Sequence, residues 1–213
     1  MRESRFVTPL PPLSIPWTMK SLGSAKTSVD ELPDGRVRFG IVHEVLHGVT
    51  PAMLVWWLNN MDGTVDVGGQ QLPRYRAWHP VDHVALTYVR PGRDGRKFSA
   101  GAQVRIQEFF GARPEFAIDV VSTITFLDET GFSHGERVLG VTVGQLDYRF
   151  TAVDEGTRYE DSLTVGIAGA PWLNRLLRRR LFSDEKGRAW QRHNVEEVGN
   201  LEHFLPALYR DGR

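Results

Sequence analysis

The sequence feature that most constrains the fold is a long amphipathic stretch near the C-terminus, from about Asp184 to Tyr209. On a helical wheel of about 100° per residue, its large apolar side chains fall on one stripe. These side chains are Trp190, Leu201, Phe204, Leu205 and Leu208. A helix turns such a stripe toward the core. The stretch therefore predicts a long C-terminal helix packed against the rest of the chain.

Two ionisable residues, His193 and Glu197, fall inside this apolar stripe, whereas Glu196, Glu202 and His203 fall well off it. Burying an unpaired charge is costly, so the pair needs a partner. A bound metal ion is one solution, because side chains four residues apart on a helix can converge on one ion. A His–Glu hydrogen bond in the core is the other. From the helix alone, the hydrogen bond is the simpler interpretation.

The composition is that of an ordinary globular protein of 213 residues, with 26 basic and 26 acidic side chains. This balance does not indicate binding to nucleic acid or to a membrane surface. The chain has no cysteine, so thiol nucleophiles and cysteine zinc sites are excluded, and any metal must be held by His, Asp or Glu. The first twenty residues lack the apolar run of a signal peptide. We expect a cytoplasmic protein.

The N-terminal segment, residues 1–35, contains several prolines and is expected to be an extended arm. Residues 36–213 are expected to form one α+β domain. The alternation of apolar residues with other residues from Val37 to Ile41 predicts a strand. Thr50-Pro51 predicts the start of a short helix that ends near Asn60. Further strands are expected at 75–80, 83–89, 104–110, 116–127, 136–143, 145–153 and 157–165, with helix from Pro171. A curved antiparallel sheet against the C-terminal helix would enclose a cavity.

Two short motifs match catalytic patterns but lack the required context. His43-Glu44-Val45-Leu46-His47 matches HExxH, which needs a helix, yet it continues a strand pattern and is followed by Gly48. Gly131-Phe132-Ser133-His134-Gly135 matches GxSxG, which needs a following helix, yet a strand-like segment follows. We interpret the first match as chance and the second as a hairpin turn.

A second carboxylate, Glu108, is expected on an apolar strand face. By strand parity it lies with Val104, Ile106 and Phe110, while the polar residues between them face the other way. The alternative for Glu108 is an edge position or an ion pair with an internal arginine.

Two histidines, His79 and His83, precede or begin a strand-like segment. On a regular strand they would face the same way but stand too far apart to bind one ion. One could be a ligand while the other pairs with Asp82, and Pro80 could turn His79 inward. Together with Glu108, His193 and Glu197, they would supply a His₂Glu₂ set that suits zinc or another borderline divalent ion.

These segments together resemble the diacetylphloroglucinol/phloretin hydrolase family. The resemblance rests on Trp78-His79-Pro80-x-Asp82-His83, Gly48-Val49-Thr50-Pro51-x-Met53-Leu54-x-Trp56-Trp57, the Glu108 strand and His193-x-x-x-Glu197, and it runs from about Arg36 to Phe204. It implies a Bet v 1-like helix-grip fold and hydrolysis of a carbon–carbon bond between an acyl group and a phenolic ring. It also implies Zn²⁺ or another divalent ion held by His79, Glu108, His193 and Glu197, with His83 as the alternative to His79.

The resemblance further implies roles around the metal. The candidate catalytic residues are His134, Tyr148 and Asp82, and Tyr75 is a candidate substrate-binding residue. Trp57 and Trp78 are further substrate-binding candidates, because aromatic side chains suit a flat apolar ligand. The expected partner is a small aromatic or polyketide-like substrate, or a related β-dicarbonyl compound, and a homodimer is left open.

Two other classes of function compete with the hydrolase. The same cavity could bind a lipid or polyketide without chemistry, with His193 and Glu197 as a hydrogen-bonded pair. A scaffold or membrane-surface protein could use the arginines at 175, 178, 179 and 180, although such a run usually forms a solvated helix face.

Overall fold

The computed structural model describes residues 7–181 and 183–212. Its main element is a nine-stranded antiparallel sheet in the order β1-β2-β11-β10-β9-β8-β7-β6, with β3 paired to β11. The strands are β1 Lys26–Glu31, β2 Val37–Val42, β3 Leu46–His47, β6 His83–Arg90, β7 Gln103–Phe110, β8 Arg113–Asp128, β9 Gly131–Val138, β10 Val141–Val153 and β11 Gly156–Val165. A separate hairpin joins β4 Thr64–Val67 to β5 Gln70–Pro73.

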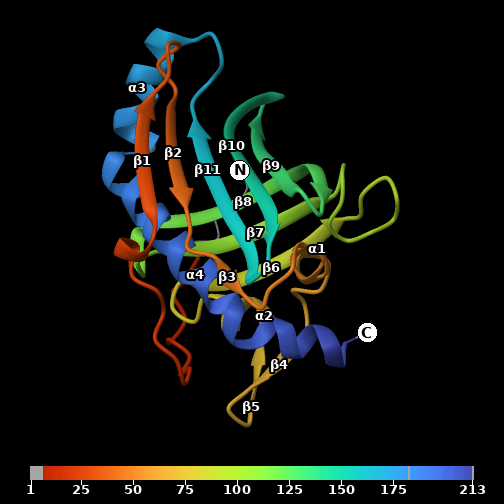
Figure 1. Cartoon of the computed structure of the whole chain (residues 1–213). Helices are drawn as coiled ribbons and strands as arrows, with labels where there is room; N and C mark the ends of the chain where they lie inside the picture. Colours follow the sequence, from red (N-terminus) through yellow and green to blue (C-terminus); the bar gives the residue numbers. More distant parts are fainter. Residues whose placement is uncertain (1–6, 182, 213) are drawn as a thin grey trace.

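The described helices are η1 Leu22–Ser24, α1 Pro51–Asn59, α2 Arg74–Trp78, α3 Pro171–Leu181 and α4 Asp184–Asp211. Figure 1 shows β1, β2, β11 and β10 side by side on the near side, while β8, β7 and β6 cross behind them. The long helix α4 contacts strands from both parts, namely β2, β3 and β7. The predicted architecture, a curved antiparallel sheet around a long C-terminal helix, is confirmed.

The helix starts follow from their sequences. The side chain of Thr50 accepts a hydrogen bond from the Met53 amide, and Pro51 occupies the first helical position of α1. The Ser183 side chain accepts from the Lys186 amide, and Asp184 begins an acidic first turn that suits the positive end of the helix dipole. Both starts agree with the sequence prediction.

The core lies between the sheet and the helices, in two clusters. One contains Phe39 and Ile41 of β2 with Trp190 of α4. The larger one includes Trp57, Phe132, Tyr159, Leu201, Phe204 and Leu205. The apolar stripe of the last helix is thus the face that the sheet covers.

Three local predictions are wrong. Residues 75–80 contain most of the helix α2 instead of a strand. The strand predicted over 136–143 is interrupted, because β9 ends at Val138 and the chain turns at Leu139 and Gly140, both with positive φ. Gly131 begins β9, so the expected hairpin turn lies just before it.

His43 and His47 do not lie on a helix, in agreement with the rejection of HExxH.

The N-terminal segment divides into two parts. Residues 7–21 are extended, and the Trp17 Nε1 group donates to Asn200 Oδ1 of α4 at 2.9 Å. Strand β1 pairs with β2 along its whole length, from Lys26 to Glu31. The sheet therefore begins before the expected boundary at Arg36, because β1 completes its edge.

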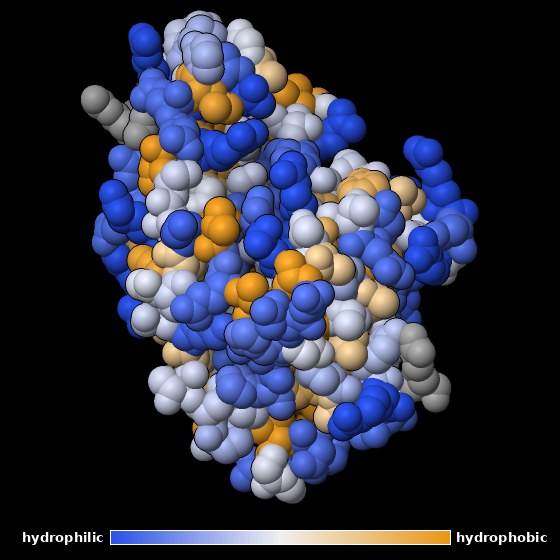
Figure 2. Space-filling view, viewed as in Figure 1, coloured by the Kyte–Doolittle hydropathy of each residue, from blue (hydrophilic) through white to orange (hydrophobic). Residues whose placement is uncertain are grey.

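The outer face of the sheet carries a groove of about 720 Å³, lined in part by Arg38, Val42, Asp147, Arg149 and Glu160. Hydrophilic side chains predominate on this side of the molecule, with scattered hydrophobic ones (Figure 2). Tyr148 and Asp161 also border this groove.

Among the described helices, none has the length and apolar character needed to cross a bilayer. Of the four arginines near residue 178, Arg175 is exposed on α3, and the side chains of the other three lie outside the described part of the chain.

Candidate functional site

A short connection brings the two histidines of the loop into the interior. Helix α2 ends at Trp78, His79 follows as its C-cap with extended backbone, and His83 begins β6. The His83 amide donates to the His79 carbonyl at 3.2 Å, which closes a tight turn over Pro80. Because this segment turns, the two imidazole rings lie only 5.6 Å apart between centroids.

Four ionisable side chains from three elements meet between the sheet and α4. They are His83 of β6, Glu108 of β7, and His193 and Glu197 of α4, here called the His/Glu cluster. His83, His193 and Glu197 are buried, and Glu108 is partly buried. The Nε2 atom of His83 lies 3.2 Å from Glu197 Oε2 and 3.6 Å from Glu108 Oε2. The Nε2 atom of His193 lies 3.8 Å and 3.9 Å from the same two oxygens.

The donor set of the His/Glu cluster fits a divalent metal. Tetrahedral nitrogen and oxygen ligands at about 2.0–2.2 Å from zinc lie about 3.3–3.6 Å from one another. The four distances in the cluster match this spacing to within a few tenths of an ångström. The ligand-bearing atoms of His83, His193 and Glu197 also lie within 4.8 Å of one another. These residues could hold one ion.

The neighbours of His83 and Glu108 orient them toward the centre of the cluster. The Nδ1 atom of His83 is 2.7 Å from the Tyr75 carbonyl, so its Nε2 atom is the one that faces the carboxylates. The Tyr75 ring stacks on the His83 ring at 3.9 Å, and the Tyr75 hydroxyl donates to Glu108 Oε2 at 2.8 Å. Tyr75 therefore supports two members of the cluster.

Asp82 holds His193 from the opposite side. Its Oδ2 atom lies 2.9 Å from His193 Nδ1 and also accepts the Gly111 amide, while Oδ1 accepts the Ala112 amide. Burial opposes ionisation, but the hydrogen bond to His193 and the charges of the imidazoles lower the pKa of Asp82 to about 2. An ionised Asp82 fixes the His193 ring with Nδ1 outward and Nε2 toward the carboxylates, as carboxylates do for metal-bound histidines.

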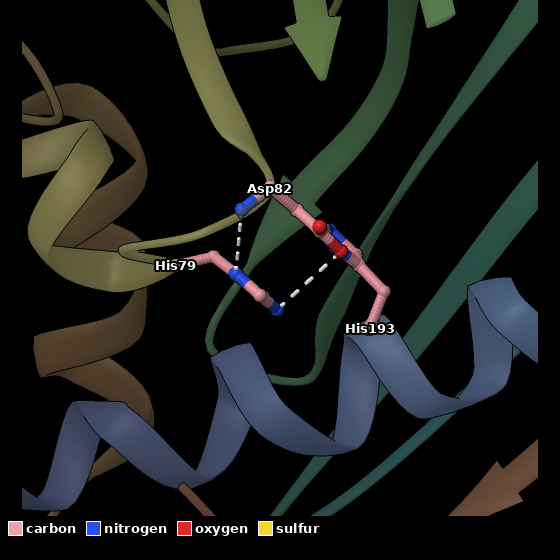
Figure 3. A group of neighbouring side chains, drawn as sticks. All are labelled: His79, Asp82 and His193. Carbon is pink, nitrogen blue, oxygen red and sulfur yellow. Dashed lines mark hydrogen bonds and ion pairs between the residues drawn. The ribbon is translucent and has the colours of Figure 1, made fainter. Parts of the chain in front are cut away.

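His79 lies next to the cluster and faces other partners. Its Nε2 atom is 3.2 Å from Glu196 Oε2 and 3.7 Å from Asp82 Oδ2, and its Nδ1 atom accepts the Asp82 amide. Figure 3 shows His79 and His193 approaching Asp82 from the α2 side and from α4. Of the two histidines considered for the first ligand position, His83 is therefore the one that lies beside Glu108 and Glu197.

Glu196 is buried, although the helical wheel places it off the apolar stripe. It accepts a hydrogen bond from Arg192, four residues earlier, and pairs with His79. Burial by itself would raise the pKa of Glu196, but the hydrogen bonds with His79 and Arg192 outweigh burial and lower this pKa. The wheel fails here because the α2–β6 connection covers this side of α4 as well. The i, i+4 Arg–Glu spacing was the available sequence signal.

Burial perturbs the protonation of every member of the His/Glu cluster. It raises the pKa of both Glu108 and Glu197, and for Glu197 the rise is large. It lowers the pKa of His83 well below the usual value, with the charge of His193 adding to the effect. Burial acts the same way on His193, but Asp82 and the two glutamates outweigh it and raise the pKa of His193 to about 9. Carboxylates that are costly to leave ionised favour a bound cation.

The other predicted residues lie around this centre. His134 Nδ1 is 2.7 Å from Ser122 Oγ, and burial lowers the pKa of His134 to about 4. Its ring lies 5.8 Å from that of Tyr148. Trp78 packs edge-on against His83, and Trp57 packs against Trp78 in the core. Within the described part of the chain, no hydrogen bond or ion pair joins His134 or Tyr148 to the cluster.

One buried pair was not anticipated from the sequence. Asp161 of β11 lies on the inner face of the sheet and contacts His43, the first histidine of the rejected HExxH match. A sequence signal existed in the alternation of Tyr159, Asp161 and Leu163, which places Asp161 with two apolar neighbours.

No family model matches the chain, and no curated protein sequence matches it. Several solved structures, in contrast, are similar to this one in fold. The crystal structure of Ara h 8.0201 aligns with a TM-score of 0.51 and 14% identity, covering 79% of this chain and 97% of that one. The di-domain ARO/CYC BexL from the BE-7585A biosynthetic pathway aligns with a TM-score of 0.50 and 10% identity, covering 80% of this chain and 50% of that one. At such identities the similarity concerns the fold alone, and with the sheet curved around α4 it establishes a Bet v 1-like helix-grip fold.

Proposed function

We propose that the protein is a metal-dependent hydrolase that cleaves the carbon–carbon bond between an acyl group and a phenolic or β-dicarbonyl substrate. The observation that carries the proposal is the His/Glu cluster, in which each of two imidazole nitrogens lies 3.2–3.9 Å from each of two carboxylate oxygens. The substrate class comes from the resemblance of the sequence to the diacetylphloroglucinol/phloretin hydrolases. The fold comparisons do not choose among functions.

In this proposal His83, Glu108, His193 and Glu197 hold the ion. A bound divalent ion such as Zn²⁺ would supply a Lewis acid for the acyl carbonyl and would lower the pKa of water. Tyr75 keeps Glu108 in place, and Asp82 keeps His193 Nε2 directed at the cluster.

The reaction adds water across the bond. The acyl carbon gains the hydroxyl group and becomes a carboxylic acid, while the ring carbon gains a proton in place of the acyl group. The ring can leave because a 1,3-dioxygenated ring has a keto form, from which the carbon departs as a stabilised enolate. Burial and neighbouring charges raise the pKa of Tyr148, so its phenol stays protonated at neutral pH and can donate to the substrate. His134 is neutral and lies beside it.

The second candidate is a binding protein that holds a hydrophobic ligand without chemistry. The observation that favours it is the number of internal partners: Asp82 already bonds His193, and Tyr75 already bonds Glu108. These contacts could satisfy the buried groups of the core without an ion.

Metal analysis of protein purified without a histidine tag separates the two functions. We expect about one zinc per chain, which is the content of a single four-ligand site. Glu197→Gln should lose the metal, while Glu196→Gln, the adjacent buried glutamate on the same helix, should keep it. The hydrolase would be excluded if the protein contained no metal both after tagless purification and after zinc supplementation. Equal losses of metal in the two variants would exclude it as well. Release of a carboxylic acid from 2,4-diacetylphloroglucinol by the loaded protein is the activity test.

A further inference from the structure

A second polar group lies on the inner face of the sheet, apart from the His/Glu cluster. Asp161 of β11 is 4% exposed and alternates with the buried Tyr159 and Leu163. Its Oδ1 atom lies 3.4 Å from Nε2 of His43, which follows β2. The His43 ring in turn meets the Tyr159 ring edge-on at 5.3 Å. Asp161 is thus a buried acid with one defined partner.

The other carboxylate oxygen of Asp161 lacks a partner. Among the described residues, no donor lies within hydrogen-bond distance of Oδ2, and the atom is buried. Buried polar atoms in folded proteins nearly always have a donor or acceptor, so an orphaned carboxylate oxygen points to a group that is not part of the chain. Burial raises the pKa of Asp161, and His43 offsets only part of that rise.

The surroundings of Asp161 are aromatic. In the register of β10 and β11, Tyr148 stands directly opposite Asp161, so the two side chains are neighbours on one face. The Tyr148 ring stacks on the Phe132 ring at 3.8 Å with a 5° angle between planes. Flat rings next to a single hydrogen-bond acceptor are what a flat ligand with one hydroxyl group requires.

Asp161 and the His/Glu cluster share the same interior. Tyr159, two residues before Asp161 and on the same face of β11, belongs to the same core cluster as Val198 of α4, the residue that follows Glu197. A ligand between the sheet and α4 could therefore meet the cluster with one end and Asp161 with the other.

We propose that Asp161 Oδ2 is a ligand-binding site that accepts a hydrogen bond from a hydroxyl group of a phenolic ligand. This inference rests on the proposed function, because the acyl group of that ligand would lie at the His/Glu cluster. It narrows the substrate class to rings with a free hydroxyl group on the side away from the acyl group, and it makes Asp161 the residue that selects them. His43 is a positioning residue, since it holds Oδ1 and leaves Oδ2 for the ligand.

The test compares two probes that differ in one hydroxyl group, 2,4,6-trihydroxyacetophenone and its 4-methyl ether. Calorimetry with the full chain should show that the wild type prefers the free hydroxyl about tenfold, or about 1.4 kcal/mol. Asp161→Asn keeps the shape but removes the charge, and charge-assisted hydrogen bonds are about twice as strong as neutral ones, so the preference should fall to about threefold. Asp161→Leu should abolish it. Asp147→Asn, a carboxylate on the outer face of β10, is the matched control and should keep the full preference.

Three results would overturn the site. They are binding of neither probe, equal binding of both probes by the wild type, and a loss in Asp147→Asn equal to that in Asp161→Asn. The titrations are run with and without one equivalent of zinc. A preference that persists in a protein that fails to bind zinc would reject the hydrolase and retain the hydroxyl site, so the two failures can be told apart.

Discussion

His83 Nε2 lies 3.2 Å from Glu197 Oε2, a contact that joins the first residue of β6 to the middle of α4. At the preceding residue of α4, Glu196 Oε2 lies 3.2 Å from His79 Nε2. Two histidines four residues apart in one loop thus each meet one of two adjacent glutamates on the helix. The pairing separates their functions, because Glu197 points to the cluster and Glu196 to Arg192.

The first prediction concerns these two histidines. His83→Ala should lower zinc affinity by more than about 100-fold, because it removes a ligand, whereas His79→Ala should lower it by about tenfold or less, as loss of an outer partner does. Competition with a chromophoric chelator measures both. The opposite order of effects would show that His79 is the ligand and that the loop rearranges when the metal binds.

The second prediction concerns Asp82. Asp82→Asn weakens the hold on His193 Nδ1 and should lower zinc affinity about 10- to 100-fold while the ligands stay in place. Nitrogen NMR of the metal-free protein should report a lower pKa for His193, because the carboxylate that favours its protonated form is lost. Asp147→Asn is the control, since Asp147 lies on the exposed face of the sheet. An unchanged His193 spectrum in Asp82→Asn would contradict the role given to Asp82.

The third prediction concerns pH. His134 is buried and its pKa is lowered to about 4, so the unfolded chain binds more protons than the folded one between that value and the ordinary pKa near 6.5. Stability therefore falls as the pH drops through this range, by about 2 kcal/mol at pH 5 relative to neutral pH for this residue alone. His134→Asn should lack that part of the loss. Urea unfolding of both proteins at pH 7.5 and pH 5 measures it, and parallel losses would rule out His134 as the cause.

The fourth prediction concerns two glycines inside α4. A methyl group at Gly187 would overlap the Phe39 ring of β2, so Gly187→Ala should destabilise the protein by about 1–3 kcal/mol. At Gly199 the methyl group would meet Lys20 Cγ at 2.8 Å and Cβ at 3.2 Å, so the Lys20 side chain must shift. Gly199→Ala should therefore cost less than Gly187→Ala, about 1 kcal/mol or less, because a side chain moves more easily than a buried ring and alanine favours helix. Thermal unfolding compares the pair, and similar losses would show that the helix backbone is the common cause.

Much of the fold was predictable because its signals are local and periodic. The alternation in β2 and the Thr50-Pro51 start of α1 depend on neighbouring residues only. The apolar stripe of α4 was equally clear and correctly placed His193 and Glu197 inside. Those features fix a sheet and a covering helix, which is most of the architecture.

The conformation of the segment from Arg74 to His83, which brings His79 and His83 to the site, was not predictable in the same way. Helix α2 has only five residues, too few to be stable alone, so tertiary contacts decide its conformation and a strand was expected in its place. The turn from His79 to His83 follows from that helix, which is why the sequence left the choice between them open. The alternation in β11 could have revealed Asp161 as a buried residue, but its pairing with His43 could not be predicted, because the two residues are far apart in the sequence and no local pattern joins them.

Helix α4 follows every strand of the sheet in the sequence, which has a consequence for biosynthesis. Two of the four residues of the His/Glu cluster, His193 and Glu197, are on α4. The hydrogen bond between Asp82 and His193 also forms only after α4 has been synthesised. A chain emerging from the ribosome cannot assemble the cluster until translation has passed residue 197. Until then α4 does not cover the inner face of the sheet, so a product of translation that stops before residue 193 lacks two of the four residues of the cluster.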